Sequence, residues 1–403
     1  AALALALAAC GGPQDPTPPA GGTPVGGGAT AGGAGGGTPA TGPDATPVGS
    51  APSGAIAAGY LHTKGGSLID AAGKVVHLRG VSWFGLETSN FAPHGLWSRS
   101  MGDLLDAVKR LGFNSIRVPF SNQLFDPGSV PNGVDATKNP DLVGLTGLQI
   151  LDRLVDGARA RGLRVILDRH RPDASGQSEL WYTSTVSEAR WIADWQMLAA
   201  RYKGDSTVVA VDLHNEPHGA ATWGDGNAAT DWRLAAERAG NAVLGVNADL
   251  LVIVEGIERY DGATTWWGGN LKGVATAPVR LSVADRVVYS PHDYPASVFP
   301  QAWFSDPSYP ANLTGVWDAH WGYIARQGIA PVWIGEFGTR DETASDQQWF
   351  HALAGYIQGN GLDFAFWSLN PNSGDTGGIL QDDWTTVNAA KAAVLGPLLQ
   401  PSP

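Results

Sequence analysis

The sequence predicts an α/β protein: a single (β/α)8 barrel, or TIM barrel, over residues 56–403, preceded by a disordered tether. Three features support this prediction: eight short runs of β-branched and aromatic residues, amphipathic segments between most of them, and a change of composition near residue 55. Continuous apolar runs are typical of strands that are buried on both faces. Their regular alternation with helices indicates a parallel sheet closed into a barrel.

The expected strands and helices follow one another along the whole segment. The strands are expected at 75–85, 115–120, 164–170, 208–217, 250–256, 286–294, 331–338 and 364–371. Helices are expected at 100–112, 148–162, 187–204, 231–247 and 346–361, where apolar residues recur every three or four positions and several segments end at glycine. The Trp- and Gly-rich stretch 255–286 gives no clear helix. An open doubly wound sheet is the alternative, but it predicts a Gly-rich phosphate loop after the first strand, and "SWFGLETSN" is not one.

Composition restricts the class of ligand. The net charge of -12 and the pI near 5.1 argue against nucleic acid or an anionic lipid surface as a partner, and they are compatible with an uncharged substrate. Many of the sixteen tryptophans can belong to the core, but such a surplus also fits a surface that stacks on flat ligands.

The first 55 residues differ from the rest. The Leu/Ala run in "AALALALAACGG" is too short to span a bilayer and resembles the end of a signal peptide. Cys10, the sole cysteine, ends "LAAC", which resembles a bacterial lipobox, whose cysteine is lipidated; ordinary cleavage with an incidental Cys10 is the alternative. Residues 11–55 are rich in Gly, Pro, Thr and Ala, which predicts a flexible tether with a mean span of ~35–40 Å. We therefore expect an exported monomer, secreted or lipid-anchored outside a bacterial membrane.

Polar and aromatic residues gather where the expected strands end. Glu216 ends the fourth strand in "VDLHNEP", and Glu336 ends the seventh in "WIGEFG". Strands three apart in a ring of eight face each other across the barrel mouth, where the chemistry of such barrels takes place. Two carboxylates ~5–5.5 Å apart carry out retaining glycoside hydrolysis, and ~6.5–9.5 Å leaves room for the water of an inverting reaction. Seven further residues share these positions: Arg117, His170, Asn215, Glu255, His292, Tyr294 and Trp367.

The ordered set of motifs resembles glycoside hydrolase family 5, in particular its bacterial endoglucanase branch. The motifs are "IRVPF", "LDRH", "LHNEP", "SPHDY", "IGEFG" and "FWSLNPNSGDTGG", and the likeness covers essentially all of 56–403. "NEP" alone marks a whole clan of barrels, but the ordered set is specific. The resemblance implies retaining, endo-acting hydrolysis of β-1,4-glucosidic bonds in cellulose or a related β-glucan, without metal or cofactor.

The resemblance also implies a role for each strand-end residue. Glu216 would be the acid/base and Glu336 the nucleophile, kept ionised by the adjacent positive charge of Arg117. Near an ionised Glu336, Glu216 should have a raised pKa. Asn215 would bond the sugar 2-hydroxyl and Tyr294 would approach Glu336. His170 and His292 would hold other hydroxyls, and Trp367 would form the floor beneath the same sugar.

Several alternatives stay open from the sequence. His214 and His218 flank Glu216, but Pro217 prevents the helical turn that a zinc protease motif needs, so His214 is expected to pack inside the barrel. Glu255 is a rival nucleophile, and a hydrogen-bond or ion-pair role is expected instead. "SGDTGG" lacks the alternating acids of a calcium loop.

The tryptophans and the substrate leave further alternatives. Trp191 and Trp195 are expected in the core. Five loop tryptophans are candidates for sugar stacking: Trp83, Trp181, Trp223, Trp266 and Trp267. Other possibilities are a β-mannanase or xyloglucanase of the same family, or a carbohydrate-binding protein that has lost turnover.

Overall fold

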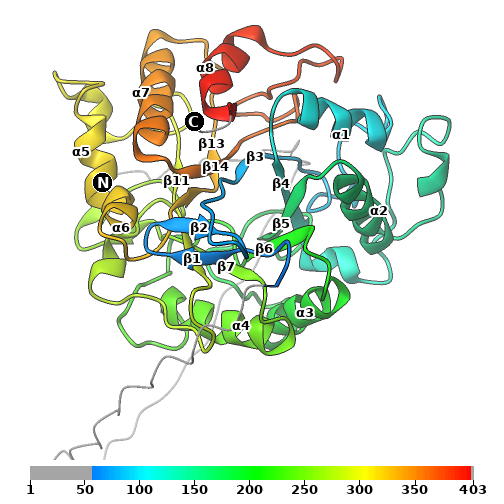
Figure 1. The fold of residues 1–403 in the computed structure, drawn as a ribbon, viewed down its shortest axis with the longest axis horizontal. Coiled ribbons are helices and arrows are strands. Elements are labelled where there is room, and N and C mark those ends of the chain that lie inside the picture. The colour runs from blue at the N-terminus through cyan, green and yellow to red at the C-terminus, as the bar shows by residue number, and fades with distance from the viewer. Residues whose placement is uncertain (1–56, 401–403) are drawn as a thin grey trace, which may run out of the picture.

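Eight parallel strands form a closed barrel in the computed structural model, which describes residues 57–400 (Figure 1). Cys10 and the segment 11–55 lie outside the described residues, so the lipidation and the tether stay predictions. The strands are β3 (Arg79–Ser82), β4 (Ser115–Ser121), β5 (Arg164–Arg171), β6 (Val208–Asp212), β7 (Leu251–Glu255), β10 (Val287–Ser290), β12 (Trp333–Ile334) and β14 (Asp363–Phe366). Each lies within or overlaps an expected strand, so the predicted barrel is confirmed.

The strand order closes the ring. The sheet runs β10-β7-β6-β5-β4-β3-β14-β12, and a parallel bridge between Tyr289 and Val332 joins its two ends. The Tyr289 N–H donates to the Pro331 carbonyl at 3.0 Å. Two short strands extend the sixth and seventh barrel strands toward the mouth: β11 (His292–Asp293) pairs with β13 (Glu336–Phe337).

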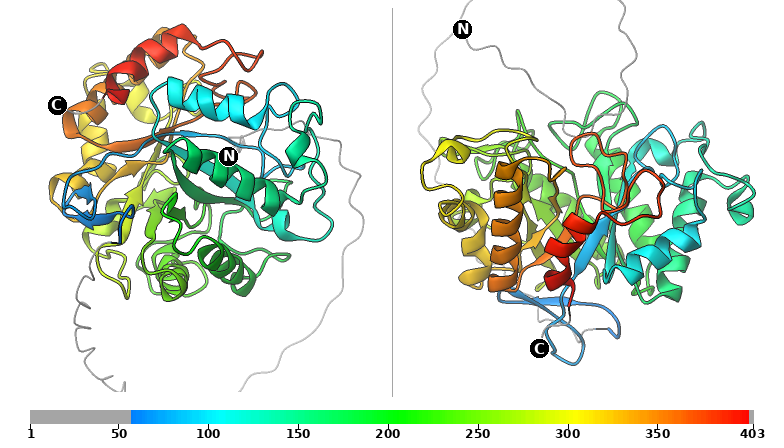
Figure 2. Two further views of the ribbon diagram at one scale, coloured as in Figure 1. Left: turned by 45° about the vertical axis from the view of Figure 1, so that its right-hand side comes forward. Right: turned by 90° about the horizontal axis from the view of Figure 1, so that it is seen from above.

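Helices surround the barrel on the outside, as Figure 2 shows from two further directions. All five expected helices are present as α1 (Met101–Arg110), α2 (Gly147–Ala160), α3 (Glu188–Arg201), α4 (Trp232–Val246) and α7 (Ala344–Asn360), and the wall also includes α8 (Ala389–Leu399). A capping box at Thr146 and Gln149 begins α2, and Gly361 in the left-handed conformation (φ 59°) ends α7. These local signals explain why the helix positions could be predicted from the sequence.

The fifth and sixth connections depart from the regular pattern. Residues after β7 form a short hairpin of β8 (Arg259–Tyr260) and β9 (Ala263–Thr264) and a 3-10 turn at Lys272–Ala275 instead of an α-helix. The helix after β11 is divided into α5 (Leu313–Trp317), a π-helical turn (Asp318–Gly322) and α6 (Tyr323–Arg326). Glycine in the Trp/Gly-rich stretch disfavours a helix there, in agreement with the absence of a clear helical pattern.

The core has two parts. Inside the ring, Ile166, Val209 and Ile253 pack with Leu61 and Leu68. A hairpin of β1 (His62–Lys64) and β2 (Ser67–Ile69) supplies these two leucines: Leu61 precedes β1, and Leu68 lies in β2. Between barrel and helices, Trp191 and Trp195 are buried as predicted, and both indoles donate to the Leu213 carbonyl. No helix within residues 57–400 is long and apolar enough to cross a bilayer.

Candidate active site

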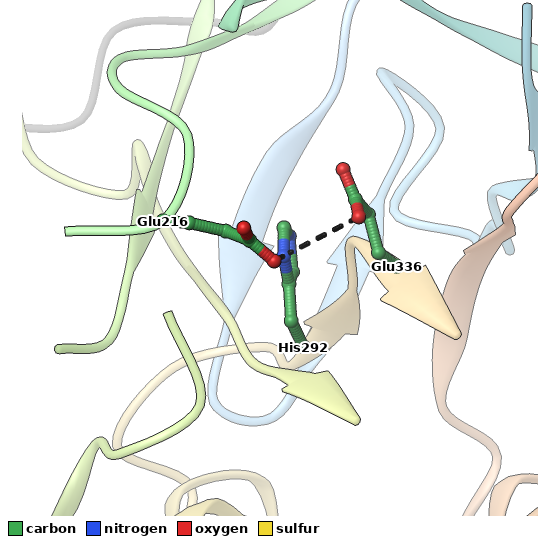
Figure 3. A group of neighbouring side chains, drawn as sticks. All are labelled: Glu216, His292 and Glu336. Carbon is green, nitrogen blue, oxygen red and sulfur yellow. Dashed lines mark hydrogen bonds and ion pairs between the residues drawn. The ribbon is translucent and has the colours of Figure 1, made fainter. Parts of the chain in front are cut away.

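The carboxyl ends of the strands bring the predicted catalytic pair together. Glu216 follows β6, Glu336 begins β13, and His292 begins β11 directly beside Glu336 in the parallel register. Figure 3 shows the three side chains converging, with the imidazole of His292 between the two carboxyls. One carboxylate oxygen of Glu216, one of Glu336 and a ring nitrogen of His292 all lie within 4.8 Å of one another. The two glutamates therefore face one small space.

Glu216 is held in an unusual backbone conformation. Its φ of 53° lies in the left-handed region, which L-residues other than Asn and Asp rarely adopt. Its N–H donates to Glu255 Oε2 at 2.7 Å. Gly268 packs against this turn, and a Cβ there would lie 2.7 Å from Glu255 Oε2 and 3.4 Å from Glu216 Cα. Glu255 and the small Gly268 together aim the Glu216 side chain into the mouth.

Glu336 is surrounded by hydrogen-bond donors. Arg117 Nη1 lies 2.5 Å from Oε1, and the Tyr294 hydroxyl donates to Oε2 at 2.5 Å. His292 Nδ1 lies 3.7 Å from the same Oε2 and 2.9 Å from Glu216 Oε1. Charge-assisted bonds of this kind favour the ionised carboxylate.

The environments separate the pKa values of the two glutamates. Burial raises the pKa of Glu216 to about 7, and the negative charge of Glu336 adds to the effect, although the hydrogen bond from His292 opposes it. Burial alone would raise the pKa of Glu336, but the charges of His292 and Arg117 outweigh it and lower that pKa. Burial opposes a charge on His292, yet Glu255 and Glu336 raise its pKa well above the ordinary value. The two opposite shifts favour a protonated Glu216 beside an ionised Glu336 below pH 7.

Arg117 makes ionic contacts with four carboxylates. Its guanidinium lies 2.5 Å from Glu336, 3.0 Å from Asp212, and 3.1 Å from both Asp168 and Glu255, and every one of these side chains is buried. Burial and the nearby Glu255 raise the pKa of Asp212 well above its usual range. Glu255 thus has the ion-pair and hydrogen-bond contacts that were expected of it.

Sequence reasoning missed Asp168 and Asp212. Asp168 Oδ2 accepts from His170 Nδ1 at 2.7 Å while it contacts Arg117. The available signal was the strand period of two, which puts Asp168 and His170 on the same face of β5.

Asn215 Nδ2 and His170 Nε2 are among the buried polar atoms that have no hydrogen-bond partner within residues 57–400. Asn215 Oδ1 accepts from Arg117 Nη2 at 2.8 Å, which leaves Nδ2 unbonded. His170 uses Nδ1 for Asp168, and its Nε2 is unbonded. Buried polar atoms normally find partners. These two are therefore available to a ligand.

Three of the five stacking candidates are corrected. Trp83, Trp181 and Trp223 are buried in the protein, and their indoles donate to the His94 carbonyl, the Glu188 carboxylate and the Ala277 carbonyl. Trp181 also packs against Trp191 and Trp232. A tryptophan in a strand-end loop can complete the core between barrel and helices, and the indole N–H groups of these three are bonded within the protein.

The remaining two stacking candidates and Trp367 differ in how far they are exposed. Trp266 is buried against Trp303, whereas Trp267 is partly exposed and stacks on His218 with ring centroids 3.7 Å apart. Trp367 is 3% exposed and lies nearly parallel to His170, with ring centroids 5.3 Å apart. Trp97, which sequence reasoning did not select, is 40% exposed in the loop after β3. Its exposure could not be read from the sequence.

The structure gives no support to the zinc alternative. His214 is buried and its Nδ1 lies 2.7 Å from Arg169 Nη1, while His218 Nδ1 bonds the Glu216 carbonyl. Among residues 57–400, two groups have metal-like spacing: the Glu216, His292 and Glu336 trio, and Asp168 with Asp212 and Glu255. The guanidinium of Arg117 contacts all three members of the second group.

In the "SGDTGG" turn, the buried Lys391 ammonium bonds the carbonyls of Thr376 and Gly378, so an ammonium already binds these oxygens.

A barrel mouth with two facing glutamates is typical of glycoside hydrolases. The family model "Cellulase (glycosyl hydrolase family 5)" matches residues 69–373. An endoglucanase from Paenibacillus polymyxa is 58% identical over 348 residues, which are 85% of this chain and 88% of the relative.

Solved structures agree with this match. The catalytic domain of the major endoglucanase from Xanthomonas campestris is 45% identical and superposes with a TM-score of 0.81, covering 84% of this chain and 99% of that one. A cellotetraose complex of an endocellulase from Pyrococcus horikoshii is 40% identical with a TM-score of 0.81, covering 86% and 100%. The chain belongs to glycosyl hydrolase family 5.

Replacing Glu255 with Gln should disable the site although the two side chains have the same shape. The carboxylate faces the Glu216 N–H, Arg117 Nη2 and His292 Nε2, at 2.7, 3.1 and 3.3 Å. Either orientation of an amide would point its NH2 at a donor, and such a mismatch costs ~1–3 kcal/mol. We expect kcat/KM on a soluble cellulose derivative to fall roughly 10–100-fold. Glu342→Gln, at an exposed carboxylate, is the matched control, and equal activity of the two variants would contradict this role.

Proposed function

We propose that the chain is a retaining endo-β-1,4-glucanase that cleaves cellulose or related β-glucans, with Glu336 as nucleophile and Glu216 as acid/base. The observation that carries the proposal is the pair of facing carboxylates, with oxygens within 4.8 Å and pKa values shifted in opposite directions. Oxygens this close are compatible with the ~5–5.5 Å separation between the carboxyl groups of retaining glycosidases. Opposite pKa shifts in neighbouring carboxyls indicate separate roles for them.

The residues support a double displacement. Glu336 attacks the anomeric carbon while Glu216 transfers its proton to the departing glycosidic oxygen, which releases the first product and leaves a glycosyl ester on Glu336. Glu216, now ionised, takes a proton from water, and the resulting hydroxide equivalent attacks the same carbon and frees Glu336. The unbonded Asn215 Nδ2 can donate to the 2-hydroxyl, and His170 Nε2 can meet another hydroxyl. Tyr294 and Arg117 stabilise Glu336 whenever it is ionised.

The substrate assignment rests on the relatives and on the rings at the mouth. The relatives named above are endoglucanases and an endocellulase, and one was solved with cellotetraose. Trp97 and Trp267 present partly exposed rings that can stack on glucose faces, and Trp367 is proposed as the floor beneath the cleaved sugar. The complete catalytic set disfavours a binding protein without turnover.

We further propose that the enzyme acts outside the cell as a monomer, held by a lipid on Cys10 and a tether over 11–55. A Xanthomonas campestris relative, 46% identical over 338 residues, carries the name "Major extracellular endoglucanase". The lipid anchor rests on the "LAAC" sequence alone.

Glu336→Gln should abolish turnover while the barrel stays folded, because an amide cannot form the glycosyl ester. The expected loss in kcat is on the order of 10⁴-fold or more, as for removal of other covalent nucleophiles. Reducing-sugar release from carboxymethylcellulose measures it, with circular dichroism as the check on folding. Wild-type turnover in this variant would place the nucleophile elsewhere, and Glu255→Ala would then be tested next.

Hydrolysis should retain the β-anomer and should cut within the chain. Proton NMR of a fresh cellooligosaccharide digest is expected to show β-product first, with α-product forming only by mutarotation. The viscosity of a cellulose derivative should fall before much reducing sugar accumulates. Initial α-product would rule out the double displacement. Faster cleavage of mannan than of glucan in a parallel assay would leave the mechanism intact and refute the glucanase assignment.

The pH profile of kcat/KM should be bell-shaped, with its alkaline limb near pH 7. Activity requires Glu216 protonated, so it is lost as pH rises through the Glu216 pKa of about 7. Activity also requires Glu336 ionised, and its lowered pKa places the acid limb below that of an ordinary glutamate. Initial rates between pH 3 and about pH 9 on a neutral oligosaccharide test both limbs. An alkaline limb above about pH 9 would show that a different group donates the proton.

A further inference from the structure

Asp293 is a buried carboxyl group outside the catalytic set. It lies on β11 between His292 and Tyr294, and it is 2% exposed. Neighbouring side chains of a strand point to opposite faces. His292 and Tyr294 contact the glutamates at the mouth, and Asp293 accordingly points outward into the helical layer, where it meets Trp317 and Trp349.

Two neutral indoles provide the partners of Asp293. Trp317 at the end of α5 donates to Oδ2 at 2.9 Å, and Trp349 of α7 donates to Oδ1 at 2.7 Å. Both indoles are buried, and among the described residues no Lys, Arg or His forms an ion pair with this carboxyl. Burial raises the pKa of Asp293 to about 7. A carboxyl group without a cation is costly to bury, and a packed apolar residue would be more stable at such a position.

The strand that Asp293 fixes carries contacts to both catalytic carboxyls. His292 Nδ1 bonds Glu216 Oε1 at 2.9 Å, and the Tyr294 hydroxyl bonds Glu336 Oε2 at 2.5 Å. β11 has a single paired strand, β13, in which His292 lies opposite Glu336 and Asp293 opposite Phe337. A two-residue strand has few backbone bonds to hold it. The two indole bonds tie its outer face to α5 and α7.

We propose that Asp293 is a positioning residue that fixes β11 through Trp317 and Trp349, and thereby sets the distances from His292 to Glu216 and from Tyr294 to Glu336. The proposal rests on the catalytic roles of Glu216 and Glu336 given above. Asp293 touches neither glutamate and acts through its two chain neighbours.

The chemistry of this contact requires an acceptor on both sides. Both partners are N–H donors, and an aspartate keeps an acceptor lone pair on each of its two oxygens whether it is ionised or protonated, whereas the NH2 of an asparagine cannot accept. In Asp293→Asn, either amide orientation directs NH2 at an indole N–H. The variant preserves shape and volume but removes one bond and creates a donor–donor contact, so β11 should move.

The pH profile distinguishes positioning from simple loss of stability. Glu216 is faced by His292, Glu336 and Glu255, and Glu336 is faced by His292, Arg117, His170 and Tyr294. The His292 bond lowers the pKa of Glu216, and the Tyr294 bond lowers the pKa of Glu336. Weakening both bonds should move both limbs of the kcat/KM profile to higher pH. Asp293 itself is faced by the indoles of Trp349 and Trp317, and its charge acts on the Tyr309 hydroxyl.

The experiment compares wild type with Asp293→Asn and with Asp306→Asn, a control at an exposed aspartate of the following loop. Kinetics on a soluble cellooligosaccharide are measured at a temperature where circular dichroism shows every variant folded. We expect kcat of Asp293→Asn to fall roughly 10–100-fold, KM to change less than threefold, and both pH limbs to shift upward. The control should match wild type in all three respects.

Trp317→Phe and Trp349→Phe keep the proposal testable if Asp293→Asn does not fold. Each removes one donor without introducing a mismatched one, and each should move both limbs in the same direction by a smaller amount. The proposal is overturned if a folded Asp293→Asn has the wild-type kcat and the wild-type pH profile. It is also overturned if the pH profiles of both Trp variants match that of the wild type. Those results would leave the proposed function intact, because that function is tested separately by the activity of the wild type, by Glu336→Gln, and by the stereochemistry and substrate comparison given above.

Discussion

Arg117 puts a permanent positive charge inside the barrel, and the arrangement of the mouth depends on it. Four carboxylates from four other strands meet its guanidinium at 2.5–3.1 Å. So many negative charges cannot all be stable in a buried space, which explains why the pKa of Asp212 is raised by burial and by Glu255. Removing one member of a buried ionic cluster leaves the others without compensation, at a cost of ~3–5 kcal/mol. The positions and charges of Arg117 and its four carboxylates therefore depend on one another.

The difference between the two glutamates follows from which of them Arg117 reaches. Glu336 bonds the guanidinium directly, so its charge is favoured despite burial. Within residues 57–400, Glu216 pairs with His292 alone among the cationic side chains, and it shares that histidine with Glu255 and Glu336. The link from Arg117 to Glu216 is indirect: Glu255 bonds the guanidinium with one oxygen and the Glu216 backbone N–H with the other. The cluster around Arg117 thus favours the negative charge of Glu336 and, through Glu255, holds the backbone of Glu216.

The sequence predicted the barrel and the convergence of Glu216 and Glu336 at its mouth, because both leave local signals. Strand ends such as "VDLHNEP" and "WIGEFG" place a polar residue after an apolar run, and barrel geometry then brings Glu216 and Glu336 together. The indole partners of Trp83, Trp181 and Trp223 could not be foreseen, since a loop tryptophan can turn into the core or toward solvent with the same neighbours in sequence. Asp212 and Asp293 were missed because their partners lie far along the chain. Asp168 had a local signal, since it lies two residues before His170 on the same strand.

The strand β11 shows how a TIM barrel can control a site from its outer layer. The inward face of such a strand carries the chemistry, and the outward face normally packs apolar side chains against helices. In β11 the outward position between His292 and Tyr294 holds Asp293. Its carboxyl group accepts hydrogen bonds from one tryptophan of α5 and one of α7. Directional bonds define distance and angle more narrowly than apolar contacts do, because an apolar contact tolerates sliding. Glu216 and Glu336 must differ in pKa although both contact His292. Their pKa values therefore depend on distances that directional hydrogen bonds hold more closely than apolar contacts do.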